Sequence, residues 1–410
     1  MKSKFLIATL ALITTLLSAT PVVAAPHGLN GNEWLAEIDQ AFAGVKGFSA
    51  VIVHEDGFVH QRAGGTAGPG LGMSWNTYGN IGSAQKMSAT LLFMRLIEDK
   101  FGRGNYIQIN NELNKPVYLY MPAAIKAITP AQNKQITFRD LLRHKSGIRT
   151  EHASGNPFVD FVQPITPGNY GVRSYSNTNM KLLTYLSVAY GAPHIVTQTN
   201  QKVSQFGWSP LSSNIPQFIG AYYWGMMQVR LFDKATSDVF ASCWLSDHII
   251  EFLDAPFARM YWNKNDAASS GGWYDGGVAA GHCKGQGGWY YSTRTLARLY
   301  KDLGTHSGVI SPVAYSMMYD YDGSWSSRNN RLGWNKQIAS PKLQSTFGWV
   351  SSPYHGGSHT ISFNGHSVTA KAAVIRLPGG YHAIGIVNSK EMSSNQIANA
   401  LKNAFARSIP

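Results

Sequence analysis

A serine and a lysine three residues apart, Ser83 and Lys86, stand at the start of a densely apolar segment that runs to Lys100. The spacing of its apolar residues predicts a helix buried on most sides. An i, i+3 pair on a helix places the hydroxyl and the amine on one face, close enough to exchange a proton. Burial and the positive helix start both favour the neutral amine, which can accept the proton of a weakly nucleophilic hydroxyl. The pair predicts nucleophilic catalysis at Ser83, although such a pattern also arises by chance about once in a chain of this length.

A second polar group, Tyr175-Ser176-Asn177, follows in the middle of the chain. The phenol of Tyr175 could share a proton with the serine and lysine, and the amide of Asn177 could orient Lys86 and a substrate carbonyl. Taken alone, the same three residues are more typical of a helix start, with Ser176 or Asn177 as the cap and Tyr175 as a partly buried packing residue.

Three stretches in order along the chain resemble the family of class C β-lactamases and D-alanyl-D-alanine carboxypeptidases, which are serine hydrolases of the penicillin-binding-protein type. They are Gly82-Ser83-Ala84-Gln85-Lys86, the stretch from Ile136 to Ile148 with Leu141-Leu142-Arg143-His144-Lys145-Ser146-Gly147, and Tyr175-Ser176-Asn177-Thr178-Asn179. Later landmarks, Gly287-Gly288-Trp289 and Phe347-Gly348-Trp349, are also similar to this family. The resemblance implies that Ser83 is the acyl-accepting nucleophile, that Lys86 and Tyr175 move its proton, and that the His144 stretch is a scaffold for the site.

The third motif of this family is a lysine or histidine, any residue and a glycine, on the strand that lines the cleft. Alignment back from the apolar run that starts at Val368 places Phe363-Asn364-Gly365 there, with a phenylalanine in place of the cation. The amides of Ser83 and His366 would then form the oxyanion hole. This register disfavours substrates that carry a carboxylate. A shifted register with His355-Gly356-Gly357 supplies the histidine but leaves extra residues before the next strand.

The pattern of elements predicts an α/β plus all-α fold. An antiparallel sheet, built from both ends of the chain and flanked by N- and C-terminal helices, would carry a large inserted helical lobe, as in the β-lactamase and transpeptidase fold. The expected elements are a helix capped by Asn32, a hairpin at 48–54 and 58–62, strands at 368–376 and 381–387, and a helix capped by Ser394. Residues 26–80 and 281–410 would form the α/β lobe, residues 81–280 the helical lobe, and the cleft between them the active site.

Residues 1–25 are typical of a signal peptide, because a basic start precedes a short apolar run and the small-residue ending Val23-Ala24-Ala25. The chain is therefore expected to be exported, periplasmic or secreted, without a membrane anchor. In an oxidising compartment Cys243 and Cys283 would more often pair as a disulfide than stay free.

The chain carries 35 lysines and arginines against 22 aspartates and glutamates, a net charge of +13. No tight basic run accompanies this excess, so nucleic acid is not an expected partner; a solvated surface or attraction to anionic cell-envelope polymers accounts for it. His355 and His359 do not predict a metal site, because the intervening glycines oppose a helix and a metal-site glutamate is lacking. No cofactor is expected.

The sequence thus predicts a serine hydrolase that acts on amide, lactam or ester bonds. Its partner would be a small-molecule or peptide substrate, with peptidoglycan as a candidate. The activity would be that of a D-amino-acid peptidase or carboxypeptidase, a β-lactamase or an esterase. The alternative is a catalytically decayed member that binds the cell wall or a protein, with Phe363 marking the decay.

Overall fold

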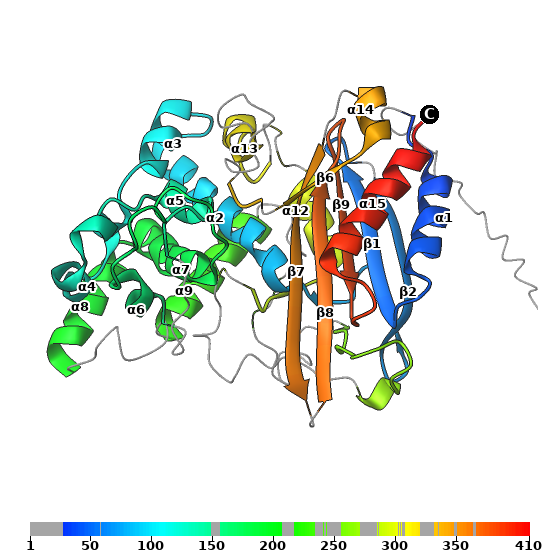
Figure 1. The fold of residues 1–410 in the computed structure, drawn as a ribbon, viewed down its shortest axis with the longest axis horizontal. Coiled ribbons are helices and arrows are strands. Elements are labelled where there is room, and N and C mark those ends of the chain that lie inside the picture. The colour runs from blue at the N-terminus through cyan, green and yellow to red at the C-terminus, as the bar shows by residue number, and fades with distance from the viewer. Residues whose placement is uncertain are drawn as a thin grey trace, which may run out of the picture.

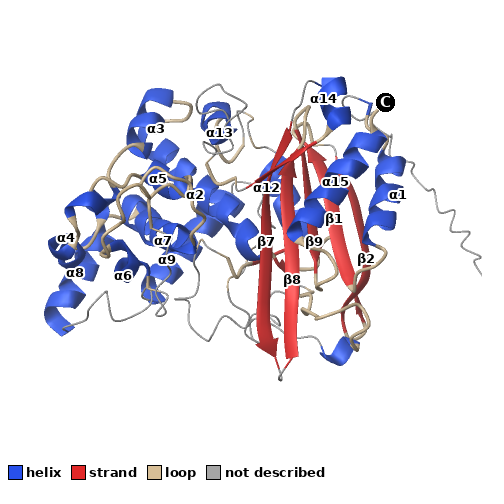
Figure 2. Cartoon of the chain, in the orientation of Figure 1, coloured by secondary structure: helices blue, strands red, loops and turns tan. Residues whose placement is uncertain are grey.

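A seven-stranded antiparallel sheet stands beside a body of helices, and two further helices cover the other face of this sheet (Figure 1). The computed structural model describes residues 28–57, 59–148, 156–206, 217–233, 241, 243, 256–270, 285, 287–301, 303, 305, 308–319, 332–334, 336–347, 351–363 and 366–410. Within these ranges the strands gather on one side and most helices on the other (Figure 2). The predicted fold class is confirmed.

The sheet joins the two ends of the chain. Its seven strands lie in the order β3-β2-β1-β9-β8-β7-β6, so the first strand pairs directly with the last. The bounds are β1 Gly47–His54, β2 Val59–Gly68, β3 Leu71–Gly72, β6 Lys336–Ala339, β7 Ser351–Phe363, β8 His366–Arg376 and β9 Tyr381–Val387. β1 and β2 form the predicted hairpin, and β7 and β8 form a second, longer one.

The flanking helices α1 Gly31–Phe42 and α15 Ser394–Ser408 pack against each other and against the sheet. They bury the predicted apolar stripes of the two helices, among them Trp34 and Phe405. Both helices begin one or two residues earlier than predicted. The cap of α1 is Asn30, whose Oδ1 accepts from the Glu33 amide at 3.2 Å, and that of α15 is Ser393, which forms a capping box with Gln396. In each case two polar residues compete locally, and helix packing on the sheet selects between them.

The helical lobe surrounds two helices that are buried along most of their length, α2 Gln85–Phe101 and α7 Asn177–Gly191. The other described helices here are α3 Tyr106–Leu113, α4 Ala123–Ile128, α5 Phe138–Leu142, α6 Pro157–Phe161, α8 His194–Phe206 and α9 Gln217–Met227, with the short turns η2 Gly82–Ala84, η3 Val117–Tyr120, η4 Ala131–Asn133 and η5 Gln228–Phe232. α12 Thr293–Lys301 packs on β1 and β9, and α14 Pro341–Phe347 follows β6.

Two segments that lie between α9 and β6 in the chain pack on different parts of the fold. Residues 256–270, which end in the short turn η6 Ala268–Ser270, lie along the sheet, because Arg259 N–H donates to Ala67 O of β2 at 2.8 Å and Thr369 N–H of β8 donates to Tyr261 O at 3.1 Å. α13 Pro312–Tyr319 instead lies against α3, on the side of the helical lobe (Figure 1). The backbone pairing of residues 256–270 joins segments far apart in the sequence, so local patterns do not encode it.

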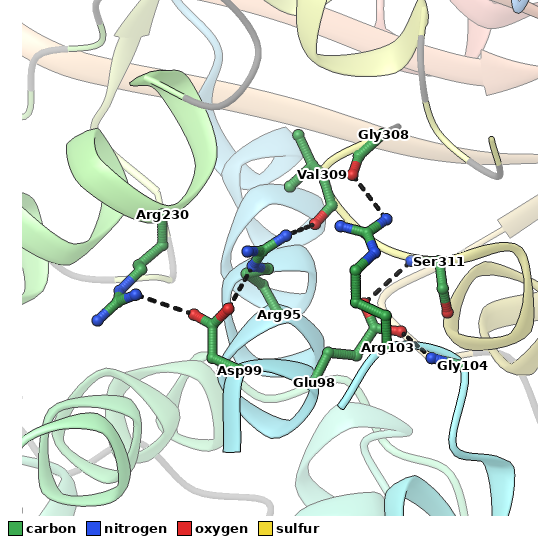
Figure 3. Close-up of polar contacts among 9 residues, drawn as sticks. All are labelled: Arg95, Glu98, Asp99, Arg103, Gly104, Arg230, Gly308, Val309 and Ser311. Atoms are coloured by element: carbon green, nitrogen blue, oxygen red, sulfur yellow. Dashed lines mark hydrogen bonds and ion pairs between the residues drawn. The ribbon is translucent and has the colours of Figure 1, made fainter. Parts of the chain in front are cut away.

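Charged side chains anchor the far end of α2 (Figure 3). The Asp99 carboxylate bridges Arg95 Nε at 2.8 Å and Arg230 of η5 at 3.2 Å. Glu98, which is buried, accepts from the Ser311 amide at 3.0 Å. These contacts fix the C-terminal turns of α2 against η5 and the segment before α13.

Several expectations fall on residues outside the described ranges: the signal peptide at 1–25, Cys283, Asn364 and Gly365. Cys243 is buried, and its pairing with Cys283 stays a prediction. None of the helices in the described part of the chain has the length and apolarity needed to span a bilayer.

Candidate active site

Ser83, Lys86 and Tyr175 meet in the structure. Lys86 Nζ donates to Ser83 Oγ at 3.0 Å, and Tyr175 OH donates to the same oxygen at 2.8 Å. Lys86 Nζ also lies 5.0 Å from the centroid of the Tyr175 ring. Lys86 is fully buried, whereas 40% of the Tyr175 surface is exposed. A hydroxyl that contacts both an amine and a phenol, next to an open surface, has the geometry of an activated nucleophile.

Backbone contacts position Ser83 in η2, the turn that opens α2. The Gly82 amide donates to Asn80 Oδ1 at 2.9 Å, and Asn80 belongs to β4 Gly79–Asn80, which pairs with β5 Tyr290–Tyr291. Gly82 has φ +50°, and a Cβ there would lie 2.7 Å from the backbone of Ser358. Glycine is required at this position both by the left-handed conformation and by the close approach of a strand.

The His144 ring packs against the ring of Tyr175. The two rings lie 4.8 Å apart at 34°, and Ser174 N–H donates to His144 O at 2.8 Å. His144 Nδ1 accepts from the Ser176 amide at 3.3 Å and lies 3.2 Å from Asn179 Nδ2. Because Nδ1 accepts, the proton of the neutral ring lies on Nε2. The His144 stretch, expected as a scaffold for the site, therefore contacts the Tyr175 side chain directly.

Asn177 is the first residue of α7, directly after the cap Ser176, whose Oγ accepts from the Thr178 amide at 3.2 Å. Its side chain is half-buried. The predicted role of Asn177 in orienting Lys86 and a substrate carbonyl stays a prediction.

The preferred register of the third motif is wrong. β7 passes the nucleophile at Gly357, where a Cβ would lie 1.8 Å from Ile81 O and 2.8 Å from Ser83 N. Phe363 lies about 20 Å further along the same strand, where it pairs with His366 at the end of the β7–β8 hairpin. Neither Phe363 nor the His366 amide is therefore placed to act at Ser83.

The shifted register, His355-Gly356-Gly357, brings the third motif to the site. The alignment back from Val368 failed because β7 and β8 continue well past the nucleophile before the chain turns. The sequence signal for the correct register was the pair of glycines at 356 and 357, since only a strand without side chains admits another backbone this closely.

His355 is a buried, neutral group beside this cluster. Its side chain lies on the same sheet face as Gly357, because alternate strand residues share a face. Burial lowers the pKa of His355 well below 6.5, and the nearby charges of Lys86, His144 and Arg173 lower it further. Burial also lowers the pKa of His144, to about 3, with Lys86 and Arg173 adding to the effect.

These shifts predict acid-sensitive stability. Both lowered pKa values favour the neutral ring in the folded protein. Below pH 6.5 the unfolded chain therefore binds more protons than the folded protein, and the free energy of unfolding decreases as the pH is lowered. When the pH is lowered from about 7 to about 5, each of the two histidines should reduce the free energy of unfolding by about 2 kcal/mol. Urea unfolding of the wild type and of His144→Asn at both pH values measures this loss, which should be smaller in the variant. His194→Gln, on the exposed surface of α8, is the matched control, and an equal pH dependence in all three proteins would contradict the prediction.

Residues 35–404 match the family model described as Beta-lactamase. No curated protein matches the chain. Among solved structures, a class C beta lactamase from Rhodobacter sphaeroides is 15% identical with a TM-score of 0.58, covering 92% of this chain and 98% of that one. A beta-lactamase/D-alanine carboxypeptidase from Yersinia pestis is 14% identical with a TM-score of 0.60 over 93% and 100% of the two chains. FmtA from Staphylococcus aureus is 18% identical with a TM-score of 0.57 over 94% and 93%. These likenesses show the fold.

Proposed function

The chain belongs to the beta-lactamase family, and we propose that it is a serine hydrolase that forms an acyl-enzyme on Ser83. A hydrolase of the beta-lactamase and carboxypeptidase type is the activity that this family suggests. One observation carries the proposal: Ser83 Oγ lies within hydrogen-bond distance of both Lys86 Nζ and Tyr175 OH.

In the first step Ser83 Oγ attacks the substrate carbonyl carbon. Its proton passes to Lys86 or Tyr175, whichever is in its basic form, and the same pair returns a proton to the leaving amine or alcohol. In the second step water takes the place of the leaving group and attacks the acyl carbon, with the pair as base, which releases the acid and restores Ser83. In both steps the proton moves within the group formed by Ser83, Lys86 and Tyr175, whose side chains are already in contact.

The oxyanion hole would use the amides of Ser83 and Ser358. The Ser358 backbone lies directly against Gly82, and Gly357 lies against the Ser83 amide, so both donors border the place where the carbonyl oxygen would gain charge. Ser358 thus takes the role first expected of His366, because β7 meets η2 at residues 357 and 358.

The substrate class is a carbonyl compound of the amide, lactam or ester type. The sequence argument against carboxylate-bearing substrates rested on Phe363, which lies far from Ser83. The phenylalanine at position 363 was also the reason for the alternative of a catalytically decayed binding module. The contacts among Ser83, Lys86 and Tyr175 do not support that alternative. We further propose that the enzyme acts outside the cytoplasm on peptides of the cell wall, with a Cys243–Cys283 disulfide.

Covalent labelling tests the acyl-enzyme. The wild-type protein should gain the mass of one fluorophosphonate or penicillin acyl group on the peptide that contains Ser83, and Ser83→Ala should gain none, because the nucleophilic oxygen is gone. Turnover of p-nitrophenyl acetate, nitrocefin and a D-alanyl-D-alanine peptide then separates esterase, β-lactamase and carboxypeptidase. Labelling that persists in Ser83→Ala would overturn the assignment.

A further inference from the structure

A pocket opens beside the sheet, and none of its lining residues belongs to the Ser83 cluster. It has a volume of about 460 Å³ and lies between the 262–270 segment and the first residues of β8. Its lining includes Trp262, Asn263, Asp266, Ser270, Ser367 and Val368. A concave site of this size, with one large aromatic ring and several polar groups, is typical of small-ligand binding.

Trp262 is exposed over 41% of its surface yet held in place. Its amide donates to Asp266 Oδ2 at 2.8 Å, and its carbonyl accepts from the Lys390 amide at 3.2 Å. Lys390 Nζ lies 4.1 Å from the centroid of the indole ring. An indole fixed on the surface, with a cation at one face, offers a flat apolar platform at little cost in conformational entropy.

The segment that carries this ring is preorganised. Asp266 Oδ2 also accepts from the Asn263 amide at 2.9 Å, and Lys46 Nζ donates to Asp266 O at 2.5 Å. Tyr261 N–H donates to Asn388 O at 2.7 Å and ties the segment to the end of β9. A ligand would therefore find the pocket in its binding shape.

The polar lining matches a neutral ligand rich in hydroxyl and amide groups. The described lining has one carboxylate, Asp266, and Lys390 Nζ lies over the Trp262 ring, so charges of both signs are near the pocket and favour neither an anion nor a cation. Ser367 offers an exposed hydroxyl, and Asn263, whose Oδ1 accepts from the Asn265 amide at 2.9 Å, keeps its amide hydrogens to donate. We propose that this pocket binds a saccharide unit, with the apolar face of the sugar ring on Trp262 and its hydroxyl and N-acetyl groups on the polar lining.

The pocket lies within reach of the nucleophile along the hairpin. Val368 pairs with Ile361, which shares a sheet face with Gly357 and hence with the Ser83 backbone. Gly357 pairs with Ala372, so Val368, four residues from Ala372 and on the same face, lies about 13 Å further along the strands. About four residues of extended peptide span that distance. If the proposed function holds, the substrate is a peptide that carries a sugar at this separation from the bond that is cleaved.

Calorimetric titration of the Ser83→Ala protein tests the binding without turnover. The probes are the tetramer of N-acetylglucosamine and cellotetraose, which separate an N-acetylated glycan from a plain glucose polymer. We expect saturable binding of the first, at least tenfold tighter than of the second, and a loss of at least tenfold in Trp262→Ala. Ser367→Tyr, which fills the pocket from an exposed strand position, should lose as much.

The matched control is Trp75→Ala. Trp75 also has a cation next to its ring, since Arg294 Cζ lies 5.6 Å from the ring centroid, but Trp75 does not line the pocket. Its binding should equal that of the parent. Absence of saturable binding to both oligosaccharides, unchanged binding in Trp262→Ala and Ser367→Tyr, or an equal loss in Trp75→Ala would each overturn the proposal. Fluorophosphonate labelling of Ser83 in the wild-type protein needs no saccharide and is read separately from the titration, so failure of the proposed function and failure of the saccharide site remain distinguishable.

Discussion

Replacing Lys86 by methionine is expected to slow acylation of Ser83 by about a thousandfold or more. The amine is the nitrogen that donates to Ser83 Oγ, at 3.0 Å, and the side chain is fully buried. Methionine has a similar volume, so the variant removes the proton acceptor with little change in packing. Loss of a member of a catalytic cluster of this kind costs about 10³ to 10⁶ in rate.

Single-turnover acylation by nitrocefin or p-nitrophenyl acetate measures the effect, with the rate of the covalent step read directly. Tyr175→Phe should cost less, about a hundredfold, because Lys86 remains in contact with the serine. Lys402→Met is the matched control, since Lys402 is also buried but lies in α15 and donates to Ala339 O of β6 at 3.0 Å. An acylation rate in Lys86→Met within tenfold of wild type would show that another group takes the proton.

Replacing Gly357 by alanine is expected to disrupt both the site and the fold around it. The added Cβ would lie 1.8 Å from Ile81 O, 2.6 Å from Ala84 N and 2.8 Å from Ser83 N. All three are backbone atoms, so no side-chain rotation can relieve the overlap and β7 must move away from η2. We expect a loss of about 3 kcal/mol in the free energy of unfolding and a fall of about a hundredfold or more in acylation rate, because the oxyanion donors separate.

Two variants control this experiment. Gly225→Ala in α9 has nothing within 4 Å of its added Cβ, so it should be neutral or stabilise the helix by up to about 1 kcal/mol. Phe363→Ala tests the register that the sequence favoured, and its acylation rate should equal that of wild type. Wild-type acylation in Gly357→Ala, together with a large loss in Phe363→Ala, would return the third motif to residues 363–365.

The sequence by itself determined the features that depend on neighbours along the chain. Ser83 and Lys86 are one helical turn apart, so their contact follows from helix geometry alone. The hairpin of β1 and β2 and the apolar stripes of α1 and α15 followed from periodicity and turn residues. The contact of Tyr175 with Ser83 was expected from family resemblance, because nothing local relates two residues so far apart in the sequence.

Only the tertiary structure decided which part of β7 faces the nucleophile. Strand register is a property of two segments together, and the β7–β8 pair extends beyond the site by a length that neither segment encodes alone. The same holds for the ring contact of His144 with Tyr175 and for the pocket that joins Trp262 to Ser367. Each of these features depends on backbone segments that tertiary packing brings together. The sequence of each segment specifies the chemistry of its side chains but not the position of the segment in the fold.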